Sequence, residues 1–176
     1  MADPPVLKTP RLVLRGHRLA DFEAMAAMWA ETETVRHIGE GRPLDGDSVF
    51  SKLLRMAGMW SLLGFGFWAV EEAGSGRLIG EIGFLERRRA DGRPPWPEAG
   101  WALASAARGK GYGTEALAAA LVWGDQRFER TICIISPGNA PSLALARRHG
   151  YRQIDPIVVE GRALVAMERE RPAPVG

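Results

Sequence analysis

Residues 108–114 read RGKGYGT, and they run directly into the helix-forming sequence EALAAALVW. Glycine inside a helix costs about 1 kcal/mol relative to alanine, so three alternating glycines indicate a special backbone requirement at the helix entrance. Without Cβ atoms they allow close approach of the backbone to a ligand. Successive N–H groups at a strand-to-helix turn, next to the positive end of a helix dipole, suit a phosphate. The segment therefore predicts an anion site, and a glycine-rich turn without ligand is the alternative.

Two common phosphate motifs do not fit this segment. The nucleotide P-loop requires Gly-x-x-x-x-Gly-Lys-Ser/Thr, and that spacing is missing. In the dinucleotide fingerprint Gly-x-Gly-x-x-Gly, the third position would be Ala116, which that motif sometimes tolerates. However, the fingerprint opens a first βαβ unit and has an acidic residue about twenty positions later. Here the segment lies beyond mid-chain, and the next strand ends in Ser136.

Hydrophobic periodicity predicts one α/β (α+β) domain around a single sheet, with helices on both faces and no dividing linker. The flanks, residues 1–10 and 170–176, are expected to be flexible tails around a domain spanning 11–169. The expected order is β-α-α-β-β-β-α-β-α-β, with a hairpin at 73–76. The expected strands are 11–15, 65–72, 77–86, 98–104, 131–136 and 162–170, and the expected helices are 21–32, 47 or 48–62, 114–128 and 143–149.

Composition excludes several classes of protein. The chain has 176 residues, is 46% hydrophobic and 25% charged, and has a net charge of only +2, with dispersed cations. These values favour a globular domain and argue against a nucleic-acid binder. No apolar run reaches membrane length, and the first residues do not resemble a signal peptide, so we expect a soluble cytoplasmic protein without a membrane partner. The single cysteine, Cys133, and three scattered histidines favour neither a disulfide nor a metal site.

With its neighbours included, the glycine segment resembles motif A of the GCN5-related N-acetyltransferases (GNAT superfamily), Arg/Gln-x-x-Gly-x-Gly/Ala. The longer stretches EAGWALASAARGKGYGTEAL, NAPSLALARRHGY and TPRLVLR are similar to the branch of the RimJ/RimL-type ribosomal-protein acetyltransferases. The resemblance covers roughly residues 9–169. It implies a GNAT-type domain with a mixed central sheet of about six or seven strands, and homodimers, which the family often forms.

The resemblance also implies acetyl-CoA as co-substrate and no metal. The glycine segment would hold the pyrophosphate, and the strand before it would separate from strand 131–136. Backbone groups of that strand would then bond the pantetheine amides as an added strand would. The implied cofactor-binding residues are Leu103, Arg108, Gly109, Lys110, Gly111, Tyr112, Gly113, Thr114, Asn139 and Ser142.

The family reaction is attack of an amine on the acetyl carbonyl, and the amine must first lose a proton. At pH 7 this costs about 4.6 kcal/mol for a lysine-type amine of pKa near 10.4, but only about 1 kcal/mol for a chain-terminal amine near 7.8. A general base is still useful as the bond forms. Glu98 is the first candidate and Glu81 the second, because both lie on expected central strands, where burial favours a basic carboxylate. A solvent-facing carboxylate is the alternative for Glu98.

The general acid is less clearly marked. Many family members carry a tyrosine seven residues after the asparagine, and here that position is Ala146. Ser142 could protonate the leaving thiolate, although a serine there could also cap a helix. The missing tyrosine motivates an alternative function, a catalytically silent CoA-binding sensor or assembly module.

The amine acceptor stays open between a protein N-terminus, a small-molecule amine and an antibiotic. Residues 32–47 and 87–99 would shape its site. Trp60 and Trp96 are expected either in the core or along the acceptor groove.

Overall fold

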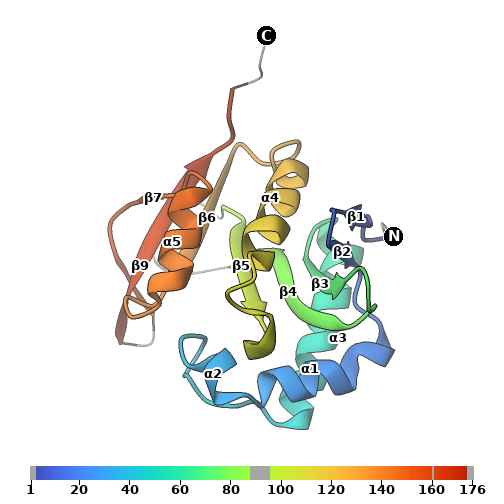
Figure 1. The fold of residues 1–176 in the computed structure, drawn as a ribbon. Helices are drawn as coiled ribbons and strands as arrows, with labels where there is room; N and C mark the ends of the chain where they lie inside the picture. The colour runs from blue at the N-terminus through green and yellow to red at the C-terminus, as the bar shows by residue number, and fades with distance from the viewer. Residues whose placement is uncertain (1–2, 88–95, 160, 174–176) are drawn as a thin grey trace.

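The computed structural model describes residues 3–87, 96–159 and 161–173 (Figure 1). The order of long strands and helices expected from the sequence is confirmed. The strands are β1 (Leu7–Lys8), β2 (Leu12–Arg15), β3 (Phe67–Glu72), β4 (Leu78–Leu85), β5 (Glu98–Leu103), β6 (Arg130–Ile135), β7 (Arg152–Gln153), β8 (Ile157–Val159) and β9 (Arg162–Glu170). The α-helices are α1 (Phe22–Trp29), α2 (Thr32–Val35), α3 (Gly46–Leu63), α4 (Tyr112–Gly124) and α5 (Ala140–Arg148).

The strands form one mixed sheet in the order β1-β2-β3-β4-β5-β6-β9-β7, with β8 pairing separately on β9. Among the strand pairs that the structure describes, only β5–β6 is parallel. The described strands outnumber the six or seven expected. The unexpected strands are β1, β7 and β8, which contain only two or three residues each. Segments this short carry too few side chains for an alternating pattern to mark them.

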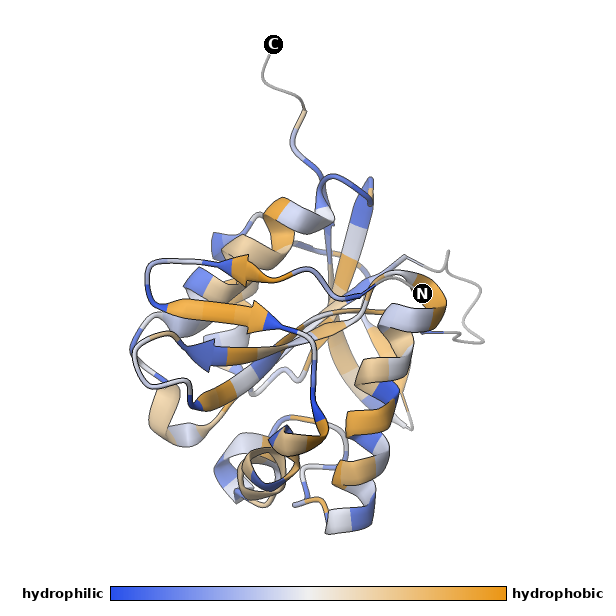
Figure 2. Cartoon of the chain, turned by 90° about the vertical axis from the view of Figure 1, so that its right-hand side faces the viewer, coloured by the Kyte–Doolittle hydropathy of each residue, from blue (hydrophilic) through white to orange (hydrophobic). Residues whose placement is uncertain are grey.

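Helices cover both faces of the sheet, as expected. Figure 2 shows the sheet with α4 on one side and the long helix α3 on the other. Helices α4 and α5 contribute the buried residues Leu117, Leu121 and Leu143 to the larger core cluster. On the opposite face, α1 and α3 form a second cluster that includes Ala102 of β5. Within the described residues, no helix is long and apolar enough to cross a bilayer.

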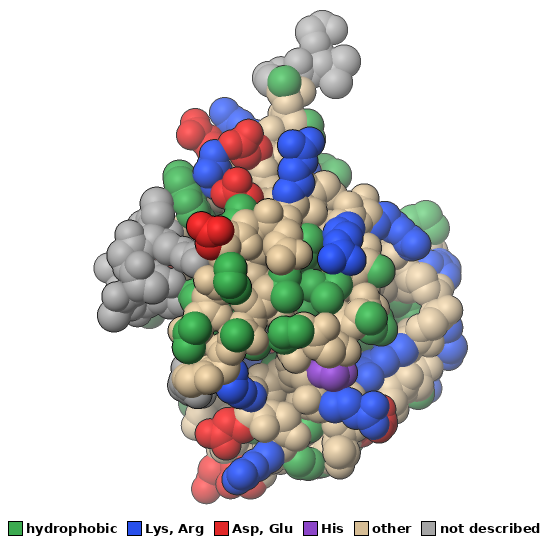
Figure 3. All heavy atoms as spheres, turned by 90° about the vertical axis from the view of Figure 1, so that its left-hand side faces the viewer, with side chains coloured by type: hydrophobic (Ala, Val, Ile, Leu, Met, Phe, Trp, Pro, Cys, Tyr) green, Lys and Arg blue, Asp and Glu red, His purple; other side chains and the backbone are tan. Residues whose placement is uncertain are grey.

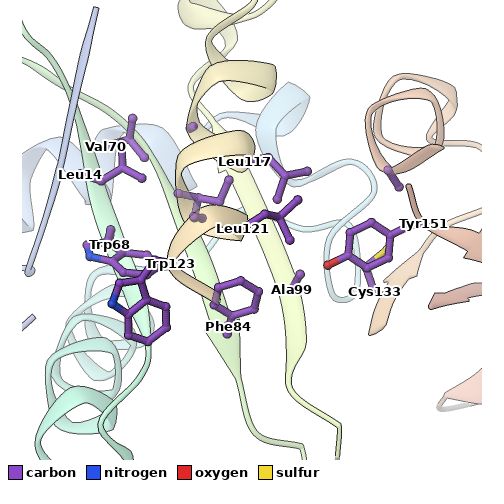
Figure 4. Packing of buried hydrophobic residues seen from close by; sticks show 14 of the residues in the cluster. Leu14, Trp68, Val70, Phe84, Ala99, Leu117, Leu121, Trp123, Cys133 and Tyr151 are labelled. Carbon is purple, nitrogen blue, oxygen red and sulfur yellow. The ribbon is translucent and has the colours of Figure 1, made fainter. Parts of the chain in front are cut away.

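Aromatic rings fill the larger core. Trp68 and Trp123 meet edge to face with ring centroids 5.1 Å apart, and Phe84 packs beside them (Figure 4). Trp60 joins this group at 4.7 Å from Trp68 and donates its indole N–H to the carbonyl of Phe67. Trp60 is only 2% exposed. The expectation that it could line an acceptor groove is therefore wrong, because its ring is used in packing.

Several helix boundaries differ from the sequence expectation. Helix α3 begins at Gly46, since the Asp45 side chain caps it by accepting from the Ser48 amide at 2.8 Å. Helix α4 begins at Tyr112 rather than Thr114 and ends at Gly124, where a turn replaces the expected last helical residues. Helix α1 ends at Trp29 rather than Thr32. Helix propensity varies little across such ends, so side-chain caps and packing decide where each helix begins and ends.

The N-terminal segment is joined to the sheet. Leu7–Lys8 pairs with Val13–Leu14, although the sequence suggested a flexible tail up to residue 10. The carbonyl of Pro5 accepts a hydrogen bond from the indole N–H of Trp68 at 2.8 Å.

A buried ion pair fixes the turn after β2. Both oxygens of Asp21 accept from the Arg15 guanidinium at 2.7 Å, and these side chains are only 7% and 6% exposed. Burial by itself would raise the pKa of Asp21, but the hydrogen bonds from Arg15 and from the Arg18 amide outweigh it and hold that pKa below its usual value. Asp21 was expected to cap α1, yet its side chain makes no such bond to the helix.

Replacing Asp21 by alanine would remove one of the two carboxylates that the buried Arg15 guanidinium contacts, so that only Glu71 remains. We expect Asp21→Ala to lower the free energy of unfolding by about 3 kcal/mol, measured by urea denaturation. The matched control is Glu33→Ala, which removes the acid of the exposed Arg36–Glu33 pair and should change stability little. Equal losses in the two variants would contradict a stabilising role of the buried pair.

Candidate active site

The site begins where two neighbouring strands part. Strands β5 and β6 pair only at Glu98 and Ile132, with the Ile132 amide donating to the Pro97 carbonyl at 3.0 Å. Beyond this point no further pair joins them (Figure 1). The separation expected from the resemblance is therefore present between these two strands.

The separation leaves backbone polar groups of β5 facing the gap. Leu103 lies opposite Gly80, and the Ala104 amide donates to the Ile79 carbonyl. In an antiparallel ladder this makes Leu103 a non-hydrogen-bonded position, whose N–H and C=O point away from β4. The same alternation directs the backbone of Trp101 to the gap. The Leu103 carbonyl accepts from Arg108 Nε at 3.1 Å, so its N–H is the group left for a ligand.

A cavity of about 1370 Å³ occupies this part of the molecule. Its walls include Lys52 and Glu81 on the side of α3, and Asn139 and Ser142 of α5 on the other side. It therefore reaches both faces of the sheet where β5 and β6 separate. On the face shown in Figure 3, hydrophobic side chains form a band with Lys and Arg side chains below it and to its right.

The glycine segment lies beside this cavity, at the end of β5. Gly109 and Gly111 have φ angles of 73° and 81°, a region that side-chain-bearing residues rarely adopt. Gly111 is the N-cap of α4, so the first amides of the helix, which have no intrahelical acceptor, open at this turn. A Cβ on Gly113 would lie 3.4 Å from Leu145 and 3.6 Å from Leu103, which places the helix start between β5 and α5.

A network that the sequence did not suggest supports this segment. Arg11 donates to the carbonyl of Lys110 at 2.9 Å and to Glu115 at 2.6 Å, and its guanidinium lies 4.8 Å from the centre of the Tyr112 ring. The Tyr112 hydroxyl donates to Glu72 at 2.7 Å, and this bond raises the pKa of Tyr112. No local pattern links positions 104 residues apart. The loop is therefore held in shape before any ligand binds.

The Arg108 side chain donates hydrogen bonds to two backbone carbonyls. Its guanidinium donates to the carbonyl of Leu103 and, at 2.9 Å, to the carbonyl of Glu33 in α2. Its charge lies near the glycine segment, but its hydrogen bonds connect the end of β5 to α2.

Helix α5 presents its first turn to the cavity. Asn139 caps the helix, its side-chain carbonyl accepting from the Ser142 amide at 3.2 Å. The expectation that α5 begins near Leu143 is therefore wrong, and so is the idea that Ser142 caps it; the cap lies three residues earlier, before Pro141 in the first turn. The Ser142 hydroxyl oxygen accepts instead from the indole N–H of Trp101 at 3.1 Å.

The two candidate carboxylates share one face of the sheet. Glu81 lies opposite Ala102, and Glu98 lies opposite Leu85. Residues directly opposite, or an even number of positions apart, point to the same face. Both carboxylates line the cavity on the side of α1 and α3. Glu98 stands where β5 leaves β6, whereas Glu81 lies deeper and is only 2% exposed.

Glu81 belongs to a buried polar group. Its Oε1 lies 2.7 Å from the ammonium of Lys52, and its Oε2 lies 4.0 Å from His17 Nε2. Among the described residues, neither ring nitrogen of His17 nor Glu81 Oε2 has a hydrogen-bond partner. Burial lowers the pKa of His17, although the charge of Glu81 opposes the shift, and the net effect favours the neutral imidazole. Sequence reasoning missed Lys52 and His17, since nothing local marks them.

Other charges on the cavity wall are mostly positive. Arg55 and Arg87 both line it. Burial lowers the pKa of Arg55, and the neighbouring charge of Arg87 adds to the effect. Across the residues that the structure describes, no three His, Cys, Asp or Glu side chains come together as a metal site would require. Much of the expected acceptor segment 87–99, namely 88–95, lies outside the described residues.

The chain is similar to known acetyltransferases in both sequence and structure. A sequence model of the GNAT acetyltransferase domain matches residues 11–152. A protein described as a GnaT-family acetyltransferase from Bordetella pertussis is 37% identical, with a TM-score of 0.82 over 94% of this chain and 99% of that chain. The acetyltransferase from Agrobacterium tumefaciens str. C58 is 27% identical, with a TM-score of 0.79 over 97% and 96%.

A more distant structure shares the fold. RimL, a ribosomal-protein acetyltransferase in complex with coenzyme A, is 13% identical, with a TM-score of 0.78 over 94% of this chain and 98% of its own.

Cys133 lies beside the cavity but is buried. The residue is 1% exposed, and burial, with a contribution from the charge of Glu98, raises the pKa of its thiol. We expect no reaction with Ellman's reagent at pH 8 in the folded protein and complete reaction in denaturant, because the thiolate is the reactive form. Rapid modification of the native protein would contradict a packing role.

Proposed function

This chain belongs to the GNAT acetyltransferase family, and we propose that it transfers the acetyl group of acetyl-CoA to a primary amine by direct attack. The observation that carries the proposal is the separation of β5 from β6 after one pair, at Glu98 and Ile132. It opens one continuous cavity to both faces of the sheet, so a thioester approaching beside α5 and an amine approaching beside α3 can meet.

The residues present fit acetyl-CoA. The turn with positive φ at Gly109 and Gly111 supports the pyrophosphate site, because free amides of the first turn of α4 converge there. The amide of Leu103 and the backbone of Trp101 would bond the pantetheine arm. The carbonyl of Asn139 already accepts from Ser142, so its NH₂ group is the part free to reach that arm. When bound, acetyl-CoA supplies an activated acyl carbon.

Glu98 is proposed as the general base. It lines the cavity at the fork of the two strands, near the point where the amine and the thioester would meet. Glu81 is proposed to attract the acceptor ammonium, since its buried carboxylate already attracts the cation of Lys52. The two carboxylates then have different tasks on one face: one binds the positive amine and the other accepts its proton.

Ser142 is proposed as the general acid. The Trp101 indole donates to its oxygen, which leaves the hydroxyl proton to be donated elsewhere. Placed at the start of α5 on the cavity wall, that proton can reach the leaving thiolate. This arrangement replaces the tyrosine that many family members carry at the position of Ala146, whose side chain is fully buried in the core here.

The branch and the acceptor are proposed from sequence. The motifs at 98–117 and 139–151 favour the RimJ/RimL-like branch, for which a protein N-terminus is the natural acceptor. A chain-terminal amine also needs the least help from a base, since its pKa lies near neutrality. A small-molecule amine is the competing acceptor within the same reaction.

Calorimetry with acetyl-CoA tests the cofactor site. We expect the wild-type protein to bind, and Gly111→Asp to weaken binding by about 100-fold, because a carboxylate would repel the phosphates and the positive φ would strain the turn. Gly64→Asp is the matched control: Gly64 has a φ of 72° at the end of α3, so it carries the same strain away from the site. Absence of binding by the wild type would reject the function, and equal binding by Gly111→Asp would reject the phosphate site.

Two isosteric variants separate the carboxylates. With the best amine from a panel of peptides, amino acids and polyamines, Glu98→Gln should lower kcat about 100-fold while the Kd for acetyl-CoA stays near normal. Glu81→Gln should mainly raise the KM for the amine. Thiol release measured at several pH values provides both constants. A larger loss of kcat in Glu81→Gln than in Glu98→Gln would assign the base to Glu81 instead.

A further inference from the structure

The cavity already contains a primary amine that belongs to the chain. Lys52, in the second turn of α3, extends its ammonium to Glu81 Oε1 at 2.7 Å, and its side chain is only 14% exposed. The ammonium also lies 4.3 Å from the centre of the Trp29 ring. A carboxylate and an aromatic face are the two groups that bind an alkylammonium in water-poor surroundings. Lys52 therefore occupies the place that the chemistry of the cavity offers to an acceptor amine.

Contacts connect this amine to the fork of the strands. The ammonium of Lys52 lies 6.0 Å from the centre of the Phe67 ring. That ring covers Gly100, where an added Cβ would lie 2.8 Å from Phe67 Cζ. Gly100 adjoins Trp101, whose backbone faces the gap beside β6. The Phe67 ring thus lies between the lysine amine and the strand edge along which the acyl donor is proposed to bind.

The other lysines differ in placement. The chain has three lysines against twenty arginines. Lys8 lies exposed on β1, and Lys110 lies exposed in the glycine segment. Neither lines the cavity, whereas Lys52 does. Of the three, only Lys52 combines confinement in the cavity with a carboxylate at hydrogen-bond distance.

We propose that Lys52 is itself an acetyl acceptor, so that the protein acetylates its own α3 when acetyl-CoA is bound and no external amine competes. This inference rests on the proposed function and adds a modification site to it. Because the amine and the donor are held in one cavity, the reaction is intramolecular and gains the advantage of a high effective concentration.

The step balances without another reactant. The Lys52 ammonium passes one proton to Glu81, whose Oε2 accepts no hydrogen bond from the described residues. The nitrogen lone pair then forms a bond to the acetyl carbon, and the carbon–sulfur bond breaks. The electron pair of that bond leaves with CoA as a thiolate, which takes up a proton, and the second nitrogen proton is lost as the amide forms. Acetylation removes the positive charge that faces Glu81.

The test uses the full-length wild-type protein with isotope-labelled acetyl-CoA and no added amine. Peptide mass spectrometry then follows the label at the three lysines separately. We expect Lys52 to be labelled at least about tenfold faster than Lys8 or Lys110, with a rate constant independent of protein concentration. Protein unfolded in urea is the control, and there the three lysines should be labelled at similar, slow rates. Lys8→Arg should leave the labelling of Lys52 unchanged, and Glu81→Gln should slow it.

Folded protein in which Lys52 is labelled no faster than Lys8 would overturn the proposal. A rate constant that rises in proportion to protein concentration would also overturn it, since that shows transfer between molecules. Calorimetry and thiol release on the same preparation distinguish the two levels of inference. If acetyl-CoA binds and an external amine is acetylated while Lys52 stays unlabelled, self-acetylation alone is wrong; if acetyl-CoA does not bind, the proposed function is wrong as well.

Discussion

The rest of the site depends on how strands β5 and β6 part. A parallel pair normally continues its hydrogen bonds along both strands, but here one pair, Glu98 with Ile132, is followed by separation. Backbone groups of Trp101 and Leu103 are then left facing a gap within the sheet. Because buried backbone polar groups need partners, this gap is suited to an extended ligand with amide groups. The cavity reaches both faces of the sheet for the same reason.

Around that gap, each helix start has a separate task. Helix α4 begins at a glycine turn whose shape is held by the Arg11–Glu115 pair and by the bond between Tyr112 and Glu72. Helix α5 is capped by Asn139, and its first turn directs Ser142 to Trp101. Helix α3, from the opposite face, brings a cation to Glu81. In the proposed function, donor binding and acceptor binding are therefore divided between the two layers of helices, and the sheet between them supplies the carboxylates.

Local signals predicted much of the fold. Alternating and helical periodicities marked the six longer strands and the main helices, because each pattern spans enough residues to be distinctive. Strands of two or three residues escaped, as did the true starts of α3, α4 and α5, where caps and packing decide the boundary. Trp60 illustrates another limit: its size allowed either a core or a groove position, and only its contacts with Trp68 and Phe67 place it in the core.

By itself, the sequence determined the order of elements, the glycine turn before α4 and the resemblance to GNAT acetyltransferases, because glycine spacing and periodicity are properties of neighbouring residues. Tertiary structure alone decided which face Glu81 and Glu98 share, that Lys52 and His17 surround Glu81, and that Ser142 meets Trp101. These facts depend on strand register and on helix packing between residues far apart in the chain. An alternating pattern shows that two faces exist, but only the neighbouring strands and helices decide what each face meets.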